Sequence, residues 1–433
     1  MKTVFTVSTI GCLLILASTC LATTINVPGN QPTIQAGIAA ANSGDTVIVA
    51  CDTYYEYDIV VKSGVVLRSE TGDPDCVVID AQQSGRVFSG ANLDSTTKIE
   101  GLTIAGGLAG TGGGMRCDSS SPRIRDCRFS GNESDYEGGA LYISNATTTC
   151  LIDNCEFLNN VGGYNPDKQG GGALFIKQSI CSVQDCVFSE NQSRDEGGGV
   201  SINNRLMSSW GGQVELSGCE FYNNSAGDDG GGVCSWGCDT VIEDCVFSGN
   251  SAFDIGGGVC LYESTPTVQS CTFVSNSTED VGFLRGAGIY LGDDCIATIA
   301  NTIVAFGQSA EGITVYTGGG STSQATLNCC NVYGNEGGDW TGEIAGQYGI
   351  NGNFSQDPLF CNLPNSDFTI DANSPCASGN HPDGYNCGLI GALEVACHYV
   401  PIGSSALIVV TVALVALAAI AIRRRNRNLQ LLN

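Results

Sequence analysis

Residues 245–262 read Cys-Val-Phe-Ser-Gly-Asn-Ser-Ala-Phe-Asp-Ile-Gly-Gly-Gly-Val-Cys-Leu-Tyr, and variants of this stretch recur along the chain. The pattern is Cys-x-Phe, an Asn three residues after the Phe, and then a glycine cluster followed by a small or branched residue. The Cys-x-Phe copies begin at Cys127, Cys155, Cys186, Cys219, Cys245 and Cys271. The matching asparagines are Asn132, Asn160, Asn191, Asn224, Asn250 and Asn276. Repetition at intervals of 26–33 residues is typical of a solenoid.

Each repeat carries short runs of strand-forming residues, such as 241–243 and 258–262, with no helical period between them. We expect three short strands in each unit. A unit this small cannot bury its own apolar face, so it must stack on its neighbours. Stacking at ~4.8 Å places every Phe, Cys and Asn over its counterpart in the next unit. The sequence therefore predicts an all-β fold, a right-handed parallel β-helix whose repeats span residues 101–345.

The repeated residues have physical roles in such a stack. Asparagine at a repeated turn can satisfy the backbone of the next coil. Glycine supplies positive φ angles and close backbone approach at corners. For the cysteine column, disulfides between neighbouring coils and a ladder of small buried thiols fit the spacing equally well.

Composition excludes several classes of protein. The 59 glycines follow no three-residue period and only 11 residues are proline, which rules out collagen. Two histidines remove most His-based catalysis and most His-ligated metal sites. A net charge of −26 argues against a nucleic-acid partner, because phosphate binding needs clustered Lys and Arg.

Both ends of the chain have the pattern of targeting segments. Residues 1–22 combine Lys2, a short apolar run and a small-residue end, which predicts a signal peptide. Residues 402–422 carry no charge and predict a transmembrane helix, and the arginines of residues 423–433 predict a basic cytoplasmic tail. The same end also resembles a bacterial C-terminal sorting signal that is cleaved. We therefore expect an exported, single-pass protein of the cell envelope or cell surface with its N-terminal part outside. That exported part keeps all 44 acidic residues against 13 basic ones, a net charge of about −31.

The motif Phe-x-x-Asn followed by Gly-Gly-Ala or Gly-Gly-Val resembles the repeat of chlamydial polymorphic outer-membrane proteins, and more broadly the right-handed β-helix, pectin-lyase-like superfamily. The resemblance covers roughly residues 101–335 and implies an elongated surface solenoid, often an adhesin. By the same resemblance, residues 23–100 look like an N-terminal cap with the first coils. Residues 346–397 look like a C-terminal module, which we expect to be stabilised by disulfides.

The remaining cysteines predict disulfides in an oxidising compartment. The close pairs are Cys51 with Cys76, Cys361 with Cys376, and Cys387 with Cys397. Cys234, Cys238 and Cys245 also have a spacing that metal ligands can have. However, Cys245 belongs to the ladder and no histidine assists.

Acidic residues precede nearly every glycine cluster, and stacked carboxylates repel one another unless cations bind. Asp228, Asp229 and Asp254 are the candidate Ca²⁺ ligands, and we expect no other cofactor. Paired acids can also perform acid–base catalysis on this fold. The candidates are Asp228, Asp229, Asp293, Asp294 and the column Asp126, Asp185 and Asp244. The alternative is ordinary turn chemistry at a solvated surface.

Longer repeat intervals mark loops that leave the solenoid, and loops carry binding residues. The candidate ligand-binding residues are Tyr164, Trp210, Phe283 and Arg285. Such aromatics suit glycans or surface proteins, although they can equally fold back as lids. The sequence therefore favours a membrane-anchored surface module for adhesion or for carbohydrate or protein binding. Two alternatives stand beside it, a polysaccharide lyase or hydrolase and a structural envelope spacer.

Overall fold

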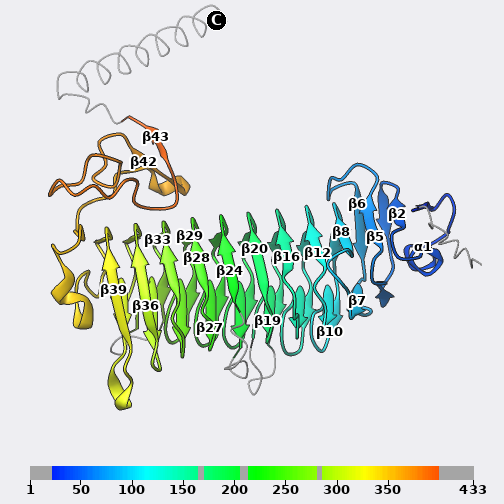
Figure 1. Cartoon of the computed structure of the whole chain (residues 1–433), viewed down its shortest axis with the longest axis horizontal. Helices are drawn as coiled ribbons and strands as arrows, with labels where there is room; N and C mark the ends of the chain where they lie inside the picture. The colour runs from blue at the N-terminus through cyan, green and yellow to red at the C-terminus, as the bar shows by residue number, and fades with distance from the viewer. Residues whose placement is uncertain (1–21, 164–169, 205–212, 280–284, 399–433) are drawn as a thin grey trace, which may run out of the picture.

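The computed structural model describes residues 22–163, 170–204, 213–279 and 285–398. These residues form a parallel β-solenoid, and Figure 1 shows its strands stacked along the long axis. The predicted all-β parallel solenoid is therefore confirmed. No helix among the described residues is long and apolar enough to cross a membrane. The predicted signal peptide up to residue 21, the transmembrane segment 402–422 and the tail 423–433 lie outside the described residues.

Four parallel sheets, called A to D here, form the walls of the solenoid. Sheet A contains β1 (Thr24–Val27), β2 (Thr46–Val49), β5 (Val66–Ser69), β8 (Lys98–Glu100), β12 (Arg123–Arg125), β16 (Cys150–Asp153), β20 (Cys181–Gln184), β24 (Val214–Ser217), β28 (Val241–Glu243), β32 (Thr267–Gln269), β36 (Ile296–Ala300) and β39 (Gln324–Asn328). Sheet B contains β3 (Asp52–Tyr54), β6 (Val77–Asp80), β9 (Thr103–Ala105), β13 (Arg128–Ser130), β17 (Glu156–Leu158), β21 (Val187–Ser189), β25 (Glu220–Tyr222), β29 (Val246–Ser248), β33 (Thr272–Val274), β37 (Ile303–Ala305) and β40 (Asn331–Tyr333).

Sheet C contains β4 (Ile59–Val60), β7 (Phe88–Ala91), β11 (Met115–Asp118), β15 (Leu141–Ser144), β19 (Leu174–Lys177), β23 (Val200–Asn203), β27 (Val233–Trp236), β31 (Val259–Tyr262), β35 (Ile289–Gly292) and β38 (Ile313–Val315). Sheet D contains β10 (Leu108–Ala109), β14 (Glu133–Ser134), β18 (Val161–Gly162), β22 (Gln192–Ser193), β26 (Ser225–Ala226), β30 (Ser251–Ala252) and β34 (Ser277–Thr278). A coil of the repeat region runs through sheets A, B, D and C in that order. It thus holds four strands where the sequence predicted three, because the strands of sheet D are two residues long and carry no alternation to reveal them.

The core is built from residues that stack on their own copies. The repeat phenylalanines form one column in which successive ring centroids are 4.5–4.9 Å apart and the rings are within 5° of parallel. In-register pairing of sheet B, for example Phe221 with Phe247, holds this column in place. Each ring is almost fully buried, so the column forms a continuous apolar spine.

The repeat asparagines form a second buried column. The backbone N–H of Asn191 donates to Oδ1 of Asn224 at 3.1 Å, and Nδ2 of Asn191 donates to the same atom at 2.9 Å. Nδ2 also donates to the carbonyl of Phe157 in the preceding coil at 2.9 Å. The same pattern joins Asn224 to Asn250. The predicted ladder therefore satisfies side chains and backbone together.

The cysteines of the repeat form a thiol ladder, which was one of the two expected alternatives. All six strong-repeat cysteines are buried and free. Each thiol donates to backbone carbonyls, as Cys245 does to Glu243 and to Leu216 of the preceding coil, at 3.1 and 3.4 Å. Burial raises the pKa of the Cys245 thiol well above its usual value. Cys234 and Cys238, suggested above as metal ligands with Cys245, are likewise buried and form no disulfide among the described residues.

Helix α1 (Ile34–Ala40) closes the N-terminal end of the solenoid, as Figure 1 shows. Thr33 caps the helix, since its hydroxyl oxygen accepts the N–H of Ala36 at 3.1 Å. The carboxylate of Glu56 accepts the N–H groups of Ile34 and Gln35. Ile34 and Ile38 are fully buried, so the helix covers the end of the core.

The C-terminal module folds back onto the side of the solenoid. It contains β41 (Phe360–Asn362), β42 (Asp367–Asp371) and β43 (Val395–Cys397), with short 3-10 helices at Gly318–Gly320, Gly342–Gln347 and Leu363–Asn365 before and within it. Figure 1 shows β42 and β43 above the strands near β33. The N–H of Ala392 donates to the hydroxyl of Thr272 in β33 at 2.9 Å. Phe368 packs against Val246 and Val274 of sheet B.

The disulfides of this module differ from the expected pairs. Cys51 joins Cys76 as predicted, but Cys361 joins Cys397, and Cys387 joins Cys329 of the solenoid. Cys376 is a fully buried free thiol rather than a disulfide partner. The reason is the fold-back, which brings Cys387 against the last coils of the solenoid. Proximity in the sequence could not indicate this contact.

Candidate functional site

The loops between sheets D and C place carboxylates of successive coils side by side. Asp195, Asp228 and Asp254 stack in one column, because the N–H of Asp228 donates to the carbonyl of Asp195 at 3.1 Å and that of Asp254 to Asp228 at 2.9 Å. Glu196 and Asp229 stack in a second column through the bond from Gly197 N–H to the Asp229 carbonyl. We call these five residues the acidic cluster. They precede β23, β27 and β31, of which Figure 1 labels β27.

The glycine clusters explain why the acids stand at this place. Gly230, directly after Asp229, has a φ of +69°, and a Cβ there would lie 2.5 Å from the carbonyl oxygen of Val233. A Cβ on Gly231 would lie 2.3 Å from the carbonyl of Gly257 in the next coil. Only glycine fits this corner, so functional side chains must come from the residues just before it.

Two carboxylates of the cluster are buried, and one of them is incompletely paired. Asp229 is 8% exposed and its Oδ2 accepts the hydroxyl of Tyr262 at 2.8 Å, whereas its buried Oδ1 has no hydrogen-bond partner. Glu196 is 9% exposed, and the indole N–H of Trp236 lies within hydrogen-bonding reach of its carboxyl group. A buried carboxylate oxygen without a donor loses its hydration and gains nothing in return.

Burial and mutual repulsion raise the pKa values of these groups. The pKa of Glu196 rises to about 8, through burial first and then through the charges of Asp195 and Asp229. The pKa of Asp229 rises to about 7 through burial and the charge of Asp228, although the Tyr262 hydroxyl opposes the rise. The pKa of Asp195 rises to about 6 for the same two reasons, burial and Asp228. Near neutral pH the cluster therefore holds both carboxylic acids and carboxylates, which is the arrangement that acid–base chemistry needs.

An apolar cluster covers the outer face of sheet C beside the acids. Trp236 stacks on Tyr262 with ring centroids 3.6 Å apart, and Tyr290 meets Tyr262 edge-on at 5.9 Å. Cys234 and Cys260 lie fully buried in the same cluster. We did not predict this cluster. The sequence cue for this cluster was the apolar run Val259–Tyr262. A strand that is apolar on both faces is covered on both faces, and all four of its side chains are buried in the structure.

A groove of about 460 Å³ runs over sheet D next to the acidic cluster. We call it the sheet-D groove, and its lining comes from successive coils. The lining residues are Val161, Gln192, Ser193, Arg194, Ser225, Ala226, Gly227, Phe253 and Glu279. Phe253, which directly precedes Asp254, is 53% exposed. Arg194 and Gly227 likewise directly precede acids of the cluster, so the groove and the cluster are neighbours along the chain in three coils.

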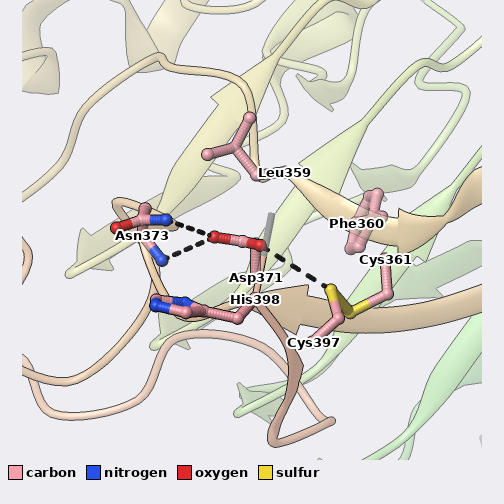
Figure 2. Close-up of a pocket in the computed structure, with 7 residues that line it drawn as sticks. All are labelled: Leu359, Phe360, Cys361, Asp371, Asn373, Cys397 and His398. Atoms are coloured by element: carbon pink, nitrogen blue, oxygen red, sulfur yellow. Dashed lines mark hydrogen bonds between the residues drawn. A yellow bond between two sulfur atoms is a disulfide. The ribbon is translucent and has the colours of Figure 1, made fainter. Parts of the chain in front are cut away.

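A second concavity, of about 500 Å³, lies in the C-terminal module. Figure 2 shows its lining, with the Cys361–Cys397 disulfide on one side and Leu359 and Phe360 nearby. Its one buried carboxylate, Asp371, accepts hydrogen bonds from the N–H and Nδ2 of Asn373 at 2.7 and 2.8 Å. Since that carboxylate is already satisfied, the sheet-D groove and the acidic cluster are the stronger candidate site.

The predicted site residues have different outcomes. Tyr164, Trp210 and Phe283 lie outside the described residues. Arg285 faces the acidic cluster, where its guanidinium pairs with the carboxylate of Asp254. The predicted Ca²⁺ candidates Asp228, Asp229 and Asp254 do lie together, with one oxygen of each within 4.8 Å of the others.

The other predicted acids stand at turns. Asp126, Asp185 and Asp244 have φ angles of +50° to +52°, and Asp294 accepts the N–H and hydroxyl of Thr322. Left-handed backbone favours Asp and Asn, so these residues fit the turn alternative.

Comparison with known proteins agrees with this architecture. Residues 35–229 and 171–355 match the model of the right-handed beta helix region. The chain belongs to the right-handed β-helix family. Among solved structures, the crystal structure of pectate lyase Pel9A is similar to this β-helix with a TM-score of 0.38 and 12% identity, over 86% of this chain and 96% of that one. No curated protein matches the chain significantly.

Proposed function

We propose that this β-helix is an exported surface protein that binds a carbohydrate in the sheet-D groove. The observation that carries the proposal is the exposed ring of Phe253 in a groove whose other large side chains are Gln192, Arg194 and Glu279. An aromatic face with a few planar polar groups suits a sugar ring, which has apolar faces and hydroxyl edges. A polysaccharide is itself a repeat, and a groove across successive coils suits a repeating ligand.

The ligand is a neutral glycan. An exported surface of about −31 repels acidic polysaccharides, and the acids of the acidic cluster follow groove residues along the chain in three coils. A surface adhesin would combine this binding with an anchor at residues 402–422, as the sequence and the resemblance to chlamydial repeats predict.

The test is binding of the full-length chain, in mild detergent, to an array of neutral and acidic glycans. We expect neutral glycans to bind, and Phe253→Ala to lose that binding. Tyr55→Ala removes another exposed ring, 63% exposed and far along the chain, and should bind as the wild type does. An array without signal, or equal binding by both variants, contradicts the proposal. For the anchor, membrane partition should disappear when residues 400–433 are deleted.

A second function, cleavage of the bound glycan, is favoured by the pKa values of the acidic cluster. Glu196, with its pKa near 8, stays protonated at neutral pH as a general acid requires, and Asp228 of the next coil is the candidate for the second carboxyl group. We expect reducing ends to appear when a bound glycan is incubated with the chain, and Glu196→Gln to abolish them. If no bound glycan loses chain length, with or without Ca²⁺, the protein is a binding module alone.

A further inference from the structure

We propose that Asp228, Asp229 and Asp254 bind one divalent cation, preferably Ca²⁺, at the corner between sheets D and C. The three carboxylates come from two adjacent coils, with the N–H of Asp254 bonded to the carbonyl of Asp228 at 2.9 Å. One oxygen of each lies within 4.8 Å of the other two. Two oxygens on one Ca²⁺ ion, at about 2.3–2.6 Å each, are at most about 5 Å apart. The spacing therefore allows one ion to contact all three side chains.

The unpaired oxygen of Asp229 points independently to a ligand. Asp229 is only 8% exposed. Its Oδ2 accepts the hydroxyl of Tyr262, whereas its Oδ1 has no hydrogen-bond partner. Buried carboxylate oxygens are normally paired. A cation bound to Oδ1 would supply the missing partner and leave the Tyr262 bond to Oδ2 in place.

Glu196 extends the site by one coil. Its column neighbour is Asp229, and its side chain is buried to nearly the same degree. Both carboxyl groups have raised pKa values because burial and neighbouring acids disfavour their charge, and a bound cation would reverse that effect. The acidic cluster thus offers hard carboxylate oxygens, which are the ligands that Ca²⁺ prefers.

Arg285 provides the competing charge. Its guanidinium pairs with Asp254, one of the three proposed ligands. A bound cation and Arg285 must therefore share Asp254. We therefore expect moderate affinity, with a dissociation constant of about 10⁻⁴–10⁻³ M, as in extracellular Ca²⁺ modules.

The inference does not depend on glycan binding, and it is tested with Ca²⁺ alone. The full-length chain in mild detergent is stripped with a chelator and titrated with CaCl₂ in a calorimeter at pH 8. We expect one ion per chain, a rise in the unfolding temperature on adding Ca²⁺, and about tenfold or greater loss of affinity in Asp229→Asn.

The matched control is Asp293→Asn, an acid at a left-handed turn of the same solenoid (φ +48°), where Asn fits equally well. It should bind Ca²⁺ as the wild type does. If Asp229→Asn does not fold, Asp228→Asn, which changes an exposed carboxylate, makes the same test. A wild type that binds no Ca²⁺, or folded cluster variants that bind like Asp293→Asn, would overturn the proposal. Arg285→Gln sharpens it, because removing the competing cation should tighten Ca²⁺ binding severalfold.

Discussion

Stacked identical side chains complement one another inside the solenoid but repel one another on its outer face over β23 to β35. Inside, each asparagine finds its partners in the neighbouring coils, and each phenylalanine stacks on an identical ring. Outside, Glu196 and Asp229 are buried beside like charges, and Oδ1 of Asp229 has no hydrogen-bond partner. Repetition stabilises the inside because identical groups there complement one another. The same repetition is unfavourable for carboxylates, which repel their own copies, so a repeated acid needs a ligand or a proton.

The largest loss of unfolding free energy should come from interrupting the column of stacked phenylalanines. Phe221 is fully buried between Phe188 and Phe247, with centroid distances of 4.8 and 4.5 Å. Phe221→Ala removes both contacts and leaves a cavity, so we expect a loss of about 3–5 kcal/mol in unfolding free energy. Guanidinium unfolding followed by circular dichroism measures it. A Phe221→Leu variant, which retains most of the volume, should lose less, and an equal loss in both would refute the cavity argument.

A smaller but still large effect should come from breaking the asparagine ladder. Asn224→Ala leaves the N–H of Asn191 and the carbonyl of Phe188 without their partners in the dry interior. At about 1–2 kcal/mol for each of the two unsatisfied groups, within the range of ~1–3 kcal/mol for such groups, we expect a loss of roughly 2–4 kcal/mol. The control is Asn223→Gly at the exposed neighbour, whose φ of +52° glycine adopts easily. Similar losses in both variants would show that the turn, rather than the ladder, supplies the stability.

These two columns were predictable from the sequence, whereas the site was predictable only in part. The Phe and Asn columns repeat at a fixed offset, and stacking assigns their neighbours without any further information. The position of Asp228, Asp229 and Asp254 at one corner followed from the same rule. Which oxygens stay unpaired depends on the hydroxyl of Tyr262 and on the outer apolar cluster, and neither belongs to the repeat motif.

The C-terminal module shows more clearly where prediction from the sequence fails. Cys387 bonds to Cys329, 58 residues earlier, because the module folds back on the solenoid. A non-repeated segment carries no periodicity that assigns its contacts. The predicted pairs therefore failed for Cys361, Cys376, Cys387 and Cys397, although Cys51 and Cys76, in adjacent coils, were paired correctly.

The unfolding free energy, measured over a pH series, should reveal the cost of ionising the buried carboxyl groups of the outer face. The pKa of Glu196 is raised from 4.5 to about 8, so its contribution to stability is complete below about pH 4.5 and is lost as the pH rises through 8. In chelator, the wild type should therefore lose stability between about pH 5 and pH 9. Glu196→Gln has no charge to bury, so it should lose less and exceed the wild type at pH 9 by about 1–3 kcal/mol. The pKa of Asp229 is also raised, so Asp229 contributes a loss of stability with rising pH in both proteins. Parallel pH profiles would mean that Glu196 is ionised without penalty.

The smallest change in unfolding free energy is expected from a substitution in the sheet-D groove. Phe253 is 53% exposed, whereas Phe221 is fully buried, so the two phenylalanines compare outer face with interior in one chain. Phe253→Ala removes little buried area and breaks no column, and we expect a change within about 0.5 kcal/mol. Unfolding in guanidinium beside Phe221→Ala measures the difference directly. A loss above ~2 kcal/mol would place Phe253 among the structural residues, and its removal could then no longer separate binding from folding. A near-zero change, together with loss of glycan binding, would mean that the exposed ring is kept for the ligand, since the fold gains nothing from it.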